Sequence, residues 1–233
     1  MAEPLPDKPQ FSIVIPVLNE AACLDQSLAK LFALPEVTSL CEVIISDGGS
    51  ADETLEIARR YPCSIVYGSV GRAMQMNTAS KTARGKFLLF LHADSTLPAT
   101  FYNNFEANAK WGFFRLRLSG DAFIYRVIEF TINLRASLSR VAGGDQGLYF
   151  NRHFFESLNG YPQIPLMEDI AICKMARCHA KPAIIESVII SSSRRWQDKG
   201  IFKTVILMWS LRLAYWLGVD PGRLYKLYYR QRG

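Results

Sequence analysis

The chain has 233 residues, 49% of them hydrophobic, and this length and composition allow one substantial buried core. Its 27 basic and 21 acidic residues give a formal charge of +6, which suits an anionic ligand, a membrane surface or nucleic acid. Five cysteines without CxxC or zinc-like spacing argue against a disulfide framework and a structural metal site, and scattered lysines and arginines without a zinc-finger or RNA-binding signature argue against a specific nucleic-acid partner.

The first ten residues, MAEPLPDKPQ, are polar and rich in proline, whereas a signal peptide would need a basic start and then an apolar run. We expect residues 1–10 to form a disordered leader. No internal repeat, low-complexity tract or linker divides the remainder. Residues 11–233 are therefore expected to form a single domain.

The first hundred residues alternate between two kinds of pattern. Short apolar runs at 12–18, 42–46, 64–67 and 86–91 predict strands that are covered on both faces. Helical patterns lie between them at about 21–33, 51–61 and 72–83. This alternation predicts parallel βαβ units.

The second half is less regular. After Pro98 we expect, in order, a helix, a strand at 113–118, a long helix near 122–140, a strand at 147–151, a helix at 168–179, a strand at 183–190 and final helices over about 201–230. The whole chain is therefore predicted to be an α/β protein with a mostly parallel central sheet and helices on both faces.

Polar residues follow each of the first four predicted strands. In open parallel sheets, ligands bind at the carboxyl ends of the strands, so Asn19, Glu20, Asp47, Arg72 and Asp94 should converge on one edge. Taken singly, the same residues also suit helix caps and turns. The loop after the first strand contains no GxGxxG, which argues against a nicotinamide enzyme.

Seven short motifs occur in this order: PVLNE at 16–20, DGGS at 47–50, GRAMQMN at 71–77, LHAD at 91–94, GGDQG at 143–147, MED at 167–169 and RRW at 194–196. Together they resemble the family 2 glycosyltransferases of the GT-A fold, and more narrowly a bacterial subgroup associated with arsenosugar biosynthesis. The resemblance covers nearly the whole chain. It implies a hexosyltransferase-like enzyme that moves a sugar from a UDP or GDP sugar to a hydroxyl of a small-molecule or lipid-linked acceptor.

The resemblance also implies a donor site. Asn19, Glu20 and Asp47 would surround the base and ribose, with Asp47 accepting a hydrogen bond from the base edge, above a floor of Pro16 and Val17. The other residues expected on the donor side are Gly71, Arg72, Gln75, Asn77, His92, Ala93, Asp94, Arg194, Arg195 and Trp196. Arginine guanidinium groups suit diphosphate oxygens, and Arg72 also begins a predicted helix, whose N-terminus favours a phosphate. A surface arginine and a solvated basic loop are the alternative interpretations.

A divalent cation, Mn²⁺ or Mg²⁺, is expected to assist the leaving diphosphate. The family usually has an Asp-x-Asp pair, but this chain has His92 in the first position and retains Asp94. Asp94 is therefore the expected metal ligand. His92 is either a second ligand, which would favour Mn²⁺ over Mg²⁺, or a packing residue.

Matching of the MED motif places Asp169 at the family's catalytic base, although acidic residues also stabilise a helix N-terminus. The base would take the proton of an acceptor hydroxyl as its oxygen attacks opposite the diphosphate, which inverts the anomeric centre. Gly144, Asp145, Gln146 and Glu168 are the residues expected on the acceptor side.

The C-terminal segment is strongly apolar from 201 to 218, but Lys203 and Arg212 interrupt it, whereas a spanning helix needs about 20 largely uncharged residues. Core packing, a homo-oligomer interface and a position on a membrane surface are the three interpretations. The cysteine pattern favours a cytoplasmic protein, either free or peripheral at the inner face of the membrane.

Two other classes of function compete with an enzyme of this family. A catalytically silent nucleotide-sugar-binding or partner-binding module would account for His92 in place of a carboxylate. A nucleotidyltransferase would share the sheet, but its glycine-rich basic loop after the first strand is missing.

Overall fold

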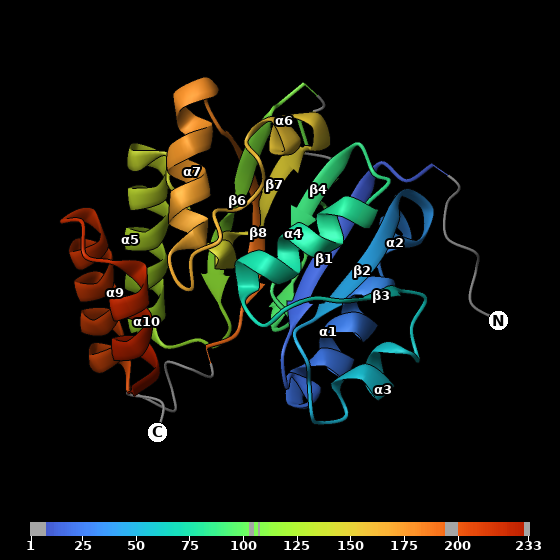
Figure 1. Ribbon diagram of the computed structural model, residues 1–233, viewed down its shortest axis with the longest axis horizontal. Coiled ribbons are helices and arrows are strands. Elements are labelled where there is room, and N and C mark those ends of the chain that lie inside the picture. The colour runs from blue at the N-terminus through green and yellow to red at the C-terminus, as the bar shows by residue number, and fades with distance from the viewer. Residues whose placement is uncertain (1–7, 103–104, 107, 194–199, 231–233) are drawn as a thin grey trace.

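In the described part of the chain the strands form one eight-stranded sheet in the order β3-β2-β1-β4-β7-β6-β8-β5 (Figure 1). The computed structural model describes residues 8–102, 105–106, 108–193 and 200–230. The strands are β1 (Phe11–Val17), β2 (Cys41–Asp47), β3 (Ser64–Tyr67), β4 (Phe87–Phe90), β5 (Ser95–Thr96), β6 (Trp111–Leu118), β7 (Leu148–Asn151) and β8 (Ala183–Ser191). The four strands predicted in the first hundred residues are confirmed as β1 to β4.

The sheet is mostly parallel, as predicted. β1 pairs in parallel with β2 and β4, β2 with β3, and β6 with β8. The antiparallel pairings join β7 to β4 and β6, and β5 to β8. The antiparallel β7 therefore separates the parallel group that begins the chain from the parallel pair β6 and β8.

Helices cover both faces of the sheet. They are α1 (Ala21–Phe32), α2 (Pro35–Leu40), α3 (Thr54–Ala58), α4 (Arg72–Thr82), α5 (Phe123–Ser139), the 3₁₀ turn η1 (Gly144–Gln146), α6 (Arg152–Ser157), α7 (Glu168–His179), α9 (Ile201–Trp216) and α10 (Pro221–Arg230). Alternation along β1 explains the layers: Ile13 and Ile15 pack in the core that contains α1, α2 and α3, whereas Val14 packs in the core that contains α4 and α7.

Three local predictions need correction. The helix predicted after Pro98 is wrong for the described residues 98–102, 105–106 and 108–110, which form turns and irregular chain. Here Phe101 and Phe105 pack edge-on against Phe11, with ring centroids 5.7 and 4.7 Å away. These aromatic contacts hold an irregular segment, not a helix, against β1. The short elements α2, α6 and β5 were not predicted from the sequence.

The helix predicted over 51–61 is shorter, because residues before it have other partners. The Ala51 N–H donates to Asn19 Oδ1 at 2.8 Å, and Asp52 accepts the N–H groups of Ala21 and Thr54 at 3.1 and 3.0 Å. These bonds hold residues 51 and 52 outside the helix, which is confined to Thr54–Ala58.

The predicted leader ends earlier than residue 10. Residues 1–7 lie outside the described part of the chain, but Pro9 is buried. The Gln10 N–H donates to the Leu40 carbonyl at 2.8 Å, and the Gln10 carbonyl accepts the Phe87 N–H at 3.0 Å. Residues 9 and 10 therefore belong to the folded structure.

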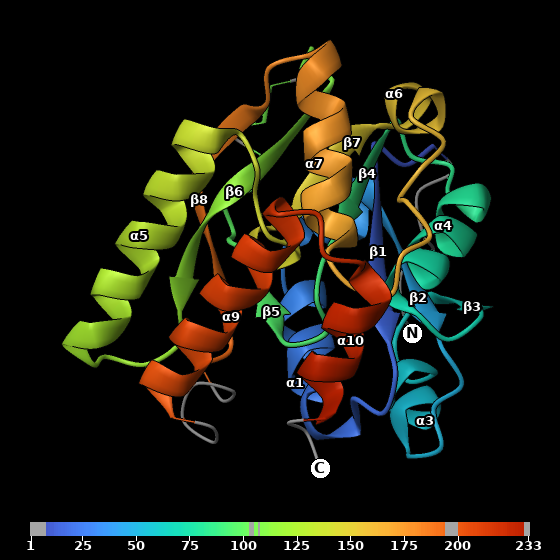
Figure 2. The same cartoon turned by 60° about the vertical axis from the view of Figure 1, so that its left-hand side comes forward.

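The C-terminal helices pack against the rest of the protein. Leu211 of α9 and Leu224 of α10 are buried in the same core as Ile172 of α7. Figure 2 shows α9 and α10 in front of the sheet, near α7, with α5 beside α9. None of the helices in the described part of the chain has the length and hydropathy of a membrane span.

Gln75 of α4 fixes the carboxyl ends of two neighbouring strands. The Gln75 side-chain Nε2 donates to the backbone carbonyls of Val17 and Ser46 at 2.7 and 2.9 Å. The backbone carbonyl of Gln75 accepts the Ser46 hydroxyl at 2.8 Å. The side chain is 4% exposed, so water cannot replace these bonds. The cross-link sets the spacing of β1 and β2 where their polar loops begin.

Replacing Gln75 by Leu should therefore lower the free energy of unfolding by about 2 kcal/mol, because two buried carbonyls lose a donor. Chemical denaturation measures this change. The matched control is Gln26→Leu on the exposed side of α1, which should change stability by less than about 0.5 kcal/mol. Equal effects of the two substitutions would contradict the cross-linking role.

Candidate active site

The carboxyl ends of the parallel strands align at one edge of the sheet. The register pairs Val17 of β1 with Asp47 of β2, and Asp47 with Tyr67 of β3. The loops continue the alignment, because the Gly48 N–H donates to the Val17 carbonyl at 3.0 Å and the Gly68 N–H donates to the Asp47 carbonyl at 2.9 Å. The predicted convergence is confirmed for the ends of β1, β2 and β3.

Asn19 and Glu20 join the loop after β1 to the loop after β2. Asn19 has a φ of 56°, a left-handed conformation that asparagine tolerates better than most residues. Its N–H donates to Ser50 Oγ at 2.9 Å, and its Oδ1 accepts the Ala51 N–H. The Glu20 N–H donates to Thr54 Oγ1 at 2.8 Å. The two residues therefore fix one loop against the other.

Asp47 is 2% exposed, and the loop that follows it occupies its carboxylate. The carboxylate accepts the N–H groups of Gly49 and Ser50 at 2.9 and 3.1 Å and the Ser50 hydroxyl at 2.6 Å. These bonds are the turn-forming role that the sequence also allowed. A bond from Asp47 to a nucleotide base stays a prediction.

The amides of Gln75 and Asn77 bind the protein backbone. Gln75 still lines the groove at the strand ends, as predicted, whereas the predicted donor contact of Asn77 is corrected. Gln75 lies under the strand ends with both N–H groups used. Asn77 Nδ2 donates to the Tyr161 carbonyl and Asn77 Oδ1 accepts the Tyr161 N–H, each at 2.8 Å. Asn77 therefore positions the segment that leads into α7.

A groove of about 240 Å³ lies at the ends of β1 and β3. Its lining includes Pro16 and Val17 from β1, Gly71 and Arg72 where α4 begins, and Glu168 where α7 begins. Each of these five residues was predicted to belong to the site. The structure brings them together from segments that are far apart in the sequence.

Three tyrosines of α10, Tyr225, Tyr228 and Tyr229, also line this groove, and the sequence did not predict their position. The Tyr225 and Tyr229 ring centroids are 4.2 Å apart, and those of Tyr228 and Tyr229 are 5.1 Å apart. Their spacing of three and four residues indicates one helix face. Pattern alone could not place that face against the strand ends.

Arg72, Glu168 and Asp169 form the charged end of the groove. Desolvation lowers the pKa of Arg72, but Glu168, Asp169, Tyr228 and Tyr229 together raise it by more, so the net shift is upward. Glu168 is 6% exposed, and burial followed by the charge of Asp169 raises its pKa to about 7, against a smaller lowering by Arg72. The site therefore contains a carboxyl group that titrates near neutral pH.

Asp169 is fixed by two backbone N–H groups. Its Oδ2 accepts the Gly144 N–H at 2.8 Å, and its Oδ1 accepts the Ile170 N–H at 2.7 Å. The missing side chain of Gly144 makes room for His92, because a Cβ at residue 144 would lie 2.9 Å from His92 Nε2 and 3.8 Å from Asp169 Cβ. His92, Gly144 and Asp169 therefore meet in one small cavity, which Arg72 and Glu168 also line.

Asp94 follows β4 and is half-buried. Among the described residues, no group of three or more His, Cys, Asp or Glu side chains could hold a metal ion. A cation at Asp94 would take its other ligands from a diphosphate and water, as Mg²⁺ commonly does. A single carboxylate oxygen donor fits that arrangement.

Two predicted contact residues are buried instead. Ala93 is 6% exposed and packs in the core on the α1 side of the sheet. Gln146 is fully buried: its Oε1 accepts the Gly143 N–H at 3.1 Å and its Nε2 donates to the Phe114 carbonyl at 3.4 Å. The predicted donor contact of Ala93 and acceptor contact of Gln146 are corrected, because neither side chain is accessible.

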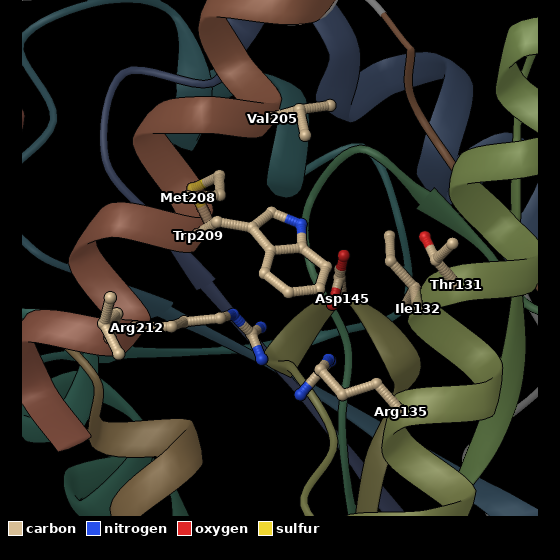
Figure 3. Close-up of a pocket in the computed structure, with 9 residues that line it drawn as sticks. Thr131, Ile132, Arg135, Asp145, Val205, Met208, Trp209 and Arg212 are labelled. Atoms are coloured by element: carbon tan, nitrogen blue, oxygen red, sulfur yellow. The ribbon is translucent and has the colours of Figure 1, made fainter.

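Asp145 faces a separate pocket between α5 and α9, together with Arg135 and Arg212 (Figure 3). Burial raises the pKa of Asp145, with Arg212 lowering it and Asp169 raising it. Burial and then the charge of Arg212 lower the pKa of Arg135 to about 10. The sequence analysis did not predict that Arg135 and Arg212 lie beside Asp145. The one signal was that Arg212 interrupts the apolar stretch from 201 to 218.

Arg194, Arg195 and Trp196 lie outside the described residues. Their predicted contact with the donor stays a prediction.

Residues 12–159 match the family model described as glycosyl transferase family 2. A PGL/p-HBAD biosynthesis glycosyltransferase of Mycobacterium bovis (strain BCG / Pasteur 1173P2) is 36% identical over 96 residues, which cover 38% of this chain and 37% of that protein. The validoxylamine A glucosyltransferase of Streptomyces hygroscopicus subsp. jinggangensis is 42% identical over 53 residues, 23% of this chain and 13% of that protein. The matches thus span only part of the length of these relatives.

Two solved structures show the likeness of fold. S. aureus TarS 1–349 in complex with UDP-GlcNAc has a TM-score of 0.60 at 16% identity, over 78% of this chain and 58% of that chain. The mannosyltransferase PcManGT from Pyrobaculum calidifontis, in complex with GDP-Man and Mn²⁺, has a TM-score of 0.58 at 19% identity, over 81% and 59%. The predicted GT-A fold is confirmed. Because the family model also matches more than half of the sequence, the chain belongs to glycosyl transferase family 2.

Proposed function

We propose that the protein is an inverting glycosyltransferase that moves a sugar from a nucleotide-diphospho-sugar of the UDP or GDP type to an acceptor hydroxyl, with Asp169 as the general base. One observation carries this proposal. Arg72 and Glu168 line both the groove at the strand ends and the small cavity that contains Asp169. A diphosphate bound at Arg72 would therefore lie next to a fixed carboxylate.

The donor nucleotide would occupy the groove. The loops of Glu20 and Asp47 would border its base and ribose, and the tyrosines of α10 offer aromatic faces for stacking. The diphosphate would bind where α4 begins, at the Arg72 guanidinium and the N-terminal end of the helix. Arg194, Arg195 and Trp196 are proposed as further donor contacts. TarS with UDP-GlcNAc and PcManGT with GDP-Man support a nucleotide-sugar donor for a protein of this fold.

A divalent cation, Mn²⁺ or Mg²⁺, would be held by Asp94 and the diphosphate oxygens. When bound, such an ion neutralises negative charge that develops on the leaving diphosphate. PcManGT is in complex with Mn²⁺, which supports a cation in this fold. His92 packs at Gly144 and is proposed as a packing residue rather than a metal ligand.

Asp169 would take the proton of the acceptor hydroxyl. The N–H groups of Gly144 and Ile170 hold its carboxylate in place, so the base needs little reorganisation. The acceptor oxygen would attack the anomeric carbon opposite the diphosphate, so an α-linked donor gives a β-linked product. Gly144 and Asp145 would border the acceptor.

Glu168 would act through its charge state. Its pKa of about 7 leaves a large protonated fraction near neutral pH. A protonated Glu168 does not repel the diphosphate or Asp169, and it leaves the positive charge of Arg72 available to the donor. Glu168 is therefore proposed as a positioning residue on the border between the donor and the acceptor.

The substitution Asp169→Asn should lower the rate of nucleoside diphosphate release from a UDP or GDP sugar by roughly 10²- to 10⁴-fold, because it removes the base. Water can serve as the acceptor in this assay. Asn can accept only one of the two N–H groups that Asp169 binds, so retained nucleotide binding must be shown by calorimetry. The exposed Asp121→Asn is the control. If Asp169→Asn retained turnover, Asp169 would not be the general base. If the wild-type protein bound a nucleotide but showed no turnover, the catalytically silent module would be favoured.

Calorimetric titration with UDP and GDP, in Mn²⁺, in Mg²⁺ and with chelator, tests the metal site. We expect one nucleotide to bind about tenfold more tightly with metal than with chelator, because the cation bridges Asp94 and the diphosphate. Asp94→Ala should abolish this difference and leave the affinity in chelator unchanged. If metal still strengthened nucleotide binding in Asp94→Ala, Asp94 would not be the metal ligand.

The raised pKa of Glu168 predicts a pH-dependent stability. Between pH 4.5 and about 7 the folded protein holds this proton more tightly than the unfolded chain does. The free energy of unfolding should therefore fall as the pH rises through this range, by roughly 2–3 kcal/mol for this group. Denaturation curves at several pH values should show that Glu168→Gln removes this part of the slope.

The matched control for this experiment is Glu186→Gln. A hydrogen bond from Arg115 lowers the pKa of Glu186, so this carboxylate stays ionised throughout the same range. The control variant should keep the wild-type slope. An unchanged slope in Glu168→Gln would show that Glu168 is already ionised at acidic pH.

A further inference from the structure

A basic pocket lies at the opposite edge of the sheet from the donor groove, where β1 and β4 begin. It has a volume of about 390 Å³ and shares no lining residue with the groove. Three separate segments line it: Lys8 and Pro9 before β1, Arg84 and Lys86 before β4, and Arg152 and His153 after β7. Figure 2 shows α6, which begins at Arg152, toward the opposite end of the molecule from α10, whose tyrosines line the donor groove.

The backbone around the basic pocket is fixed by hydrogen bonds between these segments. The Lys86 carbonyl accepts the Arg152 N–H at 2.9 Å, and the Ala83 carbonyl accepts Arg152 Nη1 at 3.0 Å. Gly85 packs directly against β1: its N–H donates to Ser12 Oγ at 2.9 Å, and a Cβ there would lie 2.5 Å from the Ser12 nitrogen. The fold therefore sets the framework of the pocket, and no ligand is needed to form it.

The basic pocket carries an excess of positive charge. Four of its lining residues are positively charged near neutral pH: Lys8, Arg84, Lys86 and Arg152. One carboxylate offsets them, because Arg84 Nε lies 2.9 Å from Glu42 Oε2. Desolvation raises the pKa of Glu42, but hydrogen bonds from Ser12 and Arg84 lower it by more, so Glu42 stays ionised near neutral pH. The ion pairs of the described residues include none of the other three basic groups, which leaves an excess of three charges.

Arg152 is the least hydrated of these groups. It is half-buried, whereas Lys8, Arg84 and Lys86 are exposed. Its Nε is one of three buried side-chain polar atoms that have no hydrogen-bond partner in the described part of the chain. A partly desolvated charge attracts an anion more strongly than a fully hydrated one does, because the local dielectric constant is lower. The protein thus leaves unmatched a charge that an anionic ligand would match.

Charge and size together favour a ligand with several phosphate groups. A single phosphate group carries at most about two negative charges near neutral pH, fewer than the three that the pocket leaves unmatched. The volume lies within the range of about 300–1,000 Å³ that ligand sites occupy. Guanidinium and ammonium groups both bind phosphate oxygens, and the lining contains no carboxylate. His153 is paired with Glu156 of the same helix at 3.4 Å and adds no charge to this balance.

We propose that the basic pocket is a second anion site, separate from the donor groove, and that its ligand is an oligophosphate, a chain of three or more linked phosphate groups. The phosphate oxygens bind the guanidinium of Arg152 and the ammonium groups of Lys8 and Lys86. Nucleoside triphosphates and inorganic polyphosphate both carry this group. The site does not rest on the proposed function, because it shares no lining residue with the donor groove.

Calorimetric titration with inorganic tripolyphosphate tests the site, in chelator and at low salt, where screening of exposed charges is weak. We expect saturable binding that weakens about tenfold in Lys86→Gln, since one charge-assisted contact is lost. Lys203→Gln on α9 is the matched control, because it removes the same charge from an exposed position outside the pocket. Arg152→Gln should weaken binding at least as much, with thermal unfolding as the check that this variant folds. Inorganic phosphate should bind at least about tenfold more weakly than tripolyphosphate.

The proposal is wrong if tripolyphosphate does not bind, or if it binds equally to Lys86→Gln and Lys203→Gln. Inorganic phosphate or heptaglutamate that binds as tightly as tripolyphosphate would also overturn it, because the site would then not select linked phosphates. Arg72→Gln reports the donor groove: binding that is lost in Arg72→Gln and kept in Lys86→Gln would place the anion in the groove and overturn the second site.

Titration with ATP in chelator distinguishes the two sources of the oligophosphate. ATP that binds as tightly as tripolyphosphate supports the site with a nucleotide as its ligand. ATP that binds more weakly than tripolyphosphate supports it with an inorganic polyphosphate, which has no nucleoside to accommodate. Either result must show the same loss of affinity in Lys86→Gln, and an ATP affinity that is unaffected by this substitution would exclude the nucleotide.

Discussion

The hydrogen bond from the Gly144 N–H to Asp169 Oδ2, 2.8 Å long, joins η1 to the first turn of α7 at the point where the chemistry is proposed. Gly144 belongs to η1, which leads into β7, and Asp169 lies in the first turn of α7. Neither segment belongs to the parallel strands that form the groove. The bond fixes the carboxylate relative to η1. Residue 144 needs to be glycine here because His92, which follows β4, occupies the space of a side chain.

Around this bond the protein gathers six charged side chains, of which Glu168 is buried and most of the others are partly buried. Glu168, Asp169 and Asp145 lie near one another, and the arginines that offset them come from three different helices: Arg72 of α4, Arg135 of α5 and Arg212 of α9. Desolvation raises the pKa of Glu168 and Asp145 and lowers that of Arg135. Perturbed groups of this kind cluster at functional sites, where ligands complete the charge balance.

The sequence predicts the strand ends well because two physical rules act locally. Apolar runs with polar ends specify buried strands, and parallel strands bring their carboxyl ends to one edge, so the pattern alone places Asn19, Asp47 and Arg72 at that edge. The roles of the amide side chains Gln75 and Asn77 could not be predicted, because their hydrogen-bond partners are distant in the sequence. Gln75 binds a carbonyl 58 residues away, and Asn77 binds Tyr161, 84 residues away. Only the folded structure shows that these amides bind backbone groups of the segments that carry the site.

The C-terminal helices were the least predictable part, because an apolar helix can cover a core, a partner or a membrane with the same pattern. In the structure they do two things at once. α9 contributes Arg212 and Trp209 to the pocket near Asp145, and α10 contributes its tyrosines to the donor groove. A short turn at Gly218 joins the two helices, and both bury a leucine in the core that holds α7. A displacement of this helical pair would therefore change the donor groove and the α5–α9 pocket together.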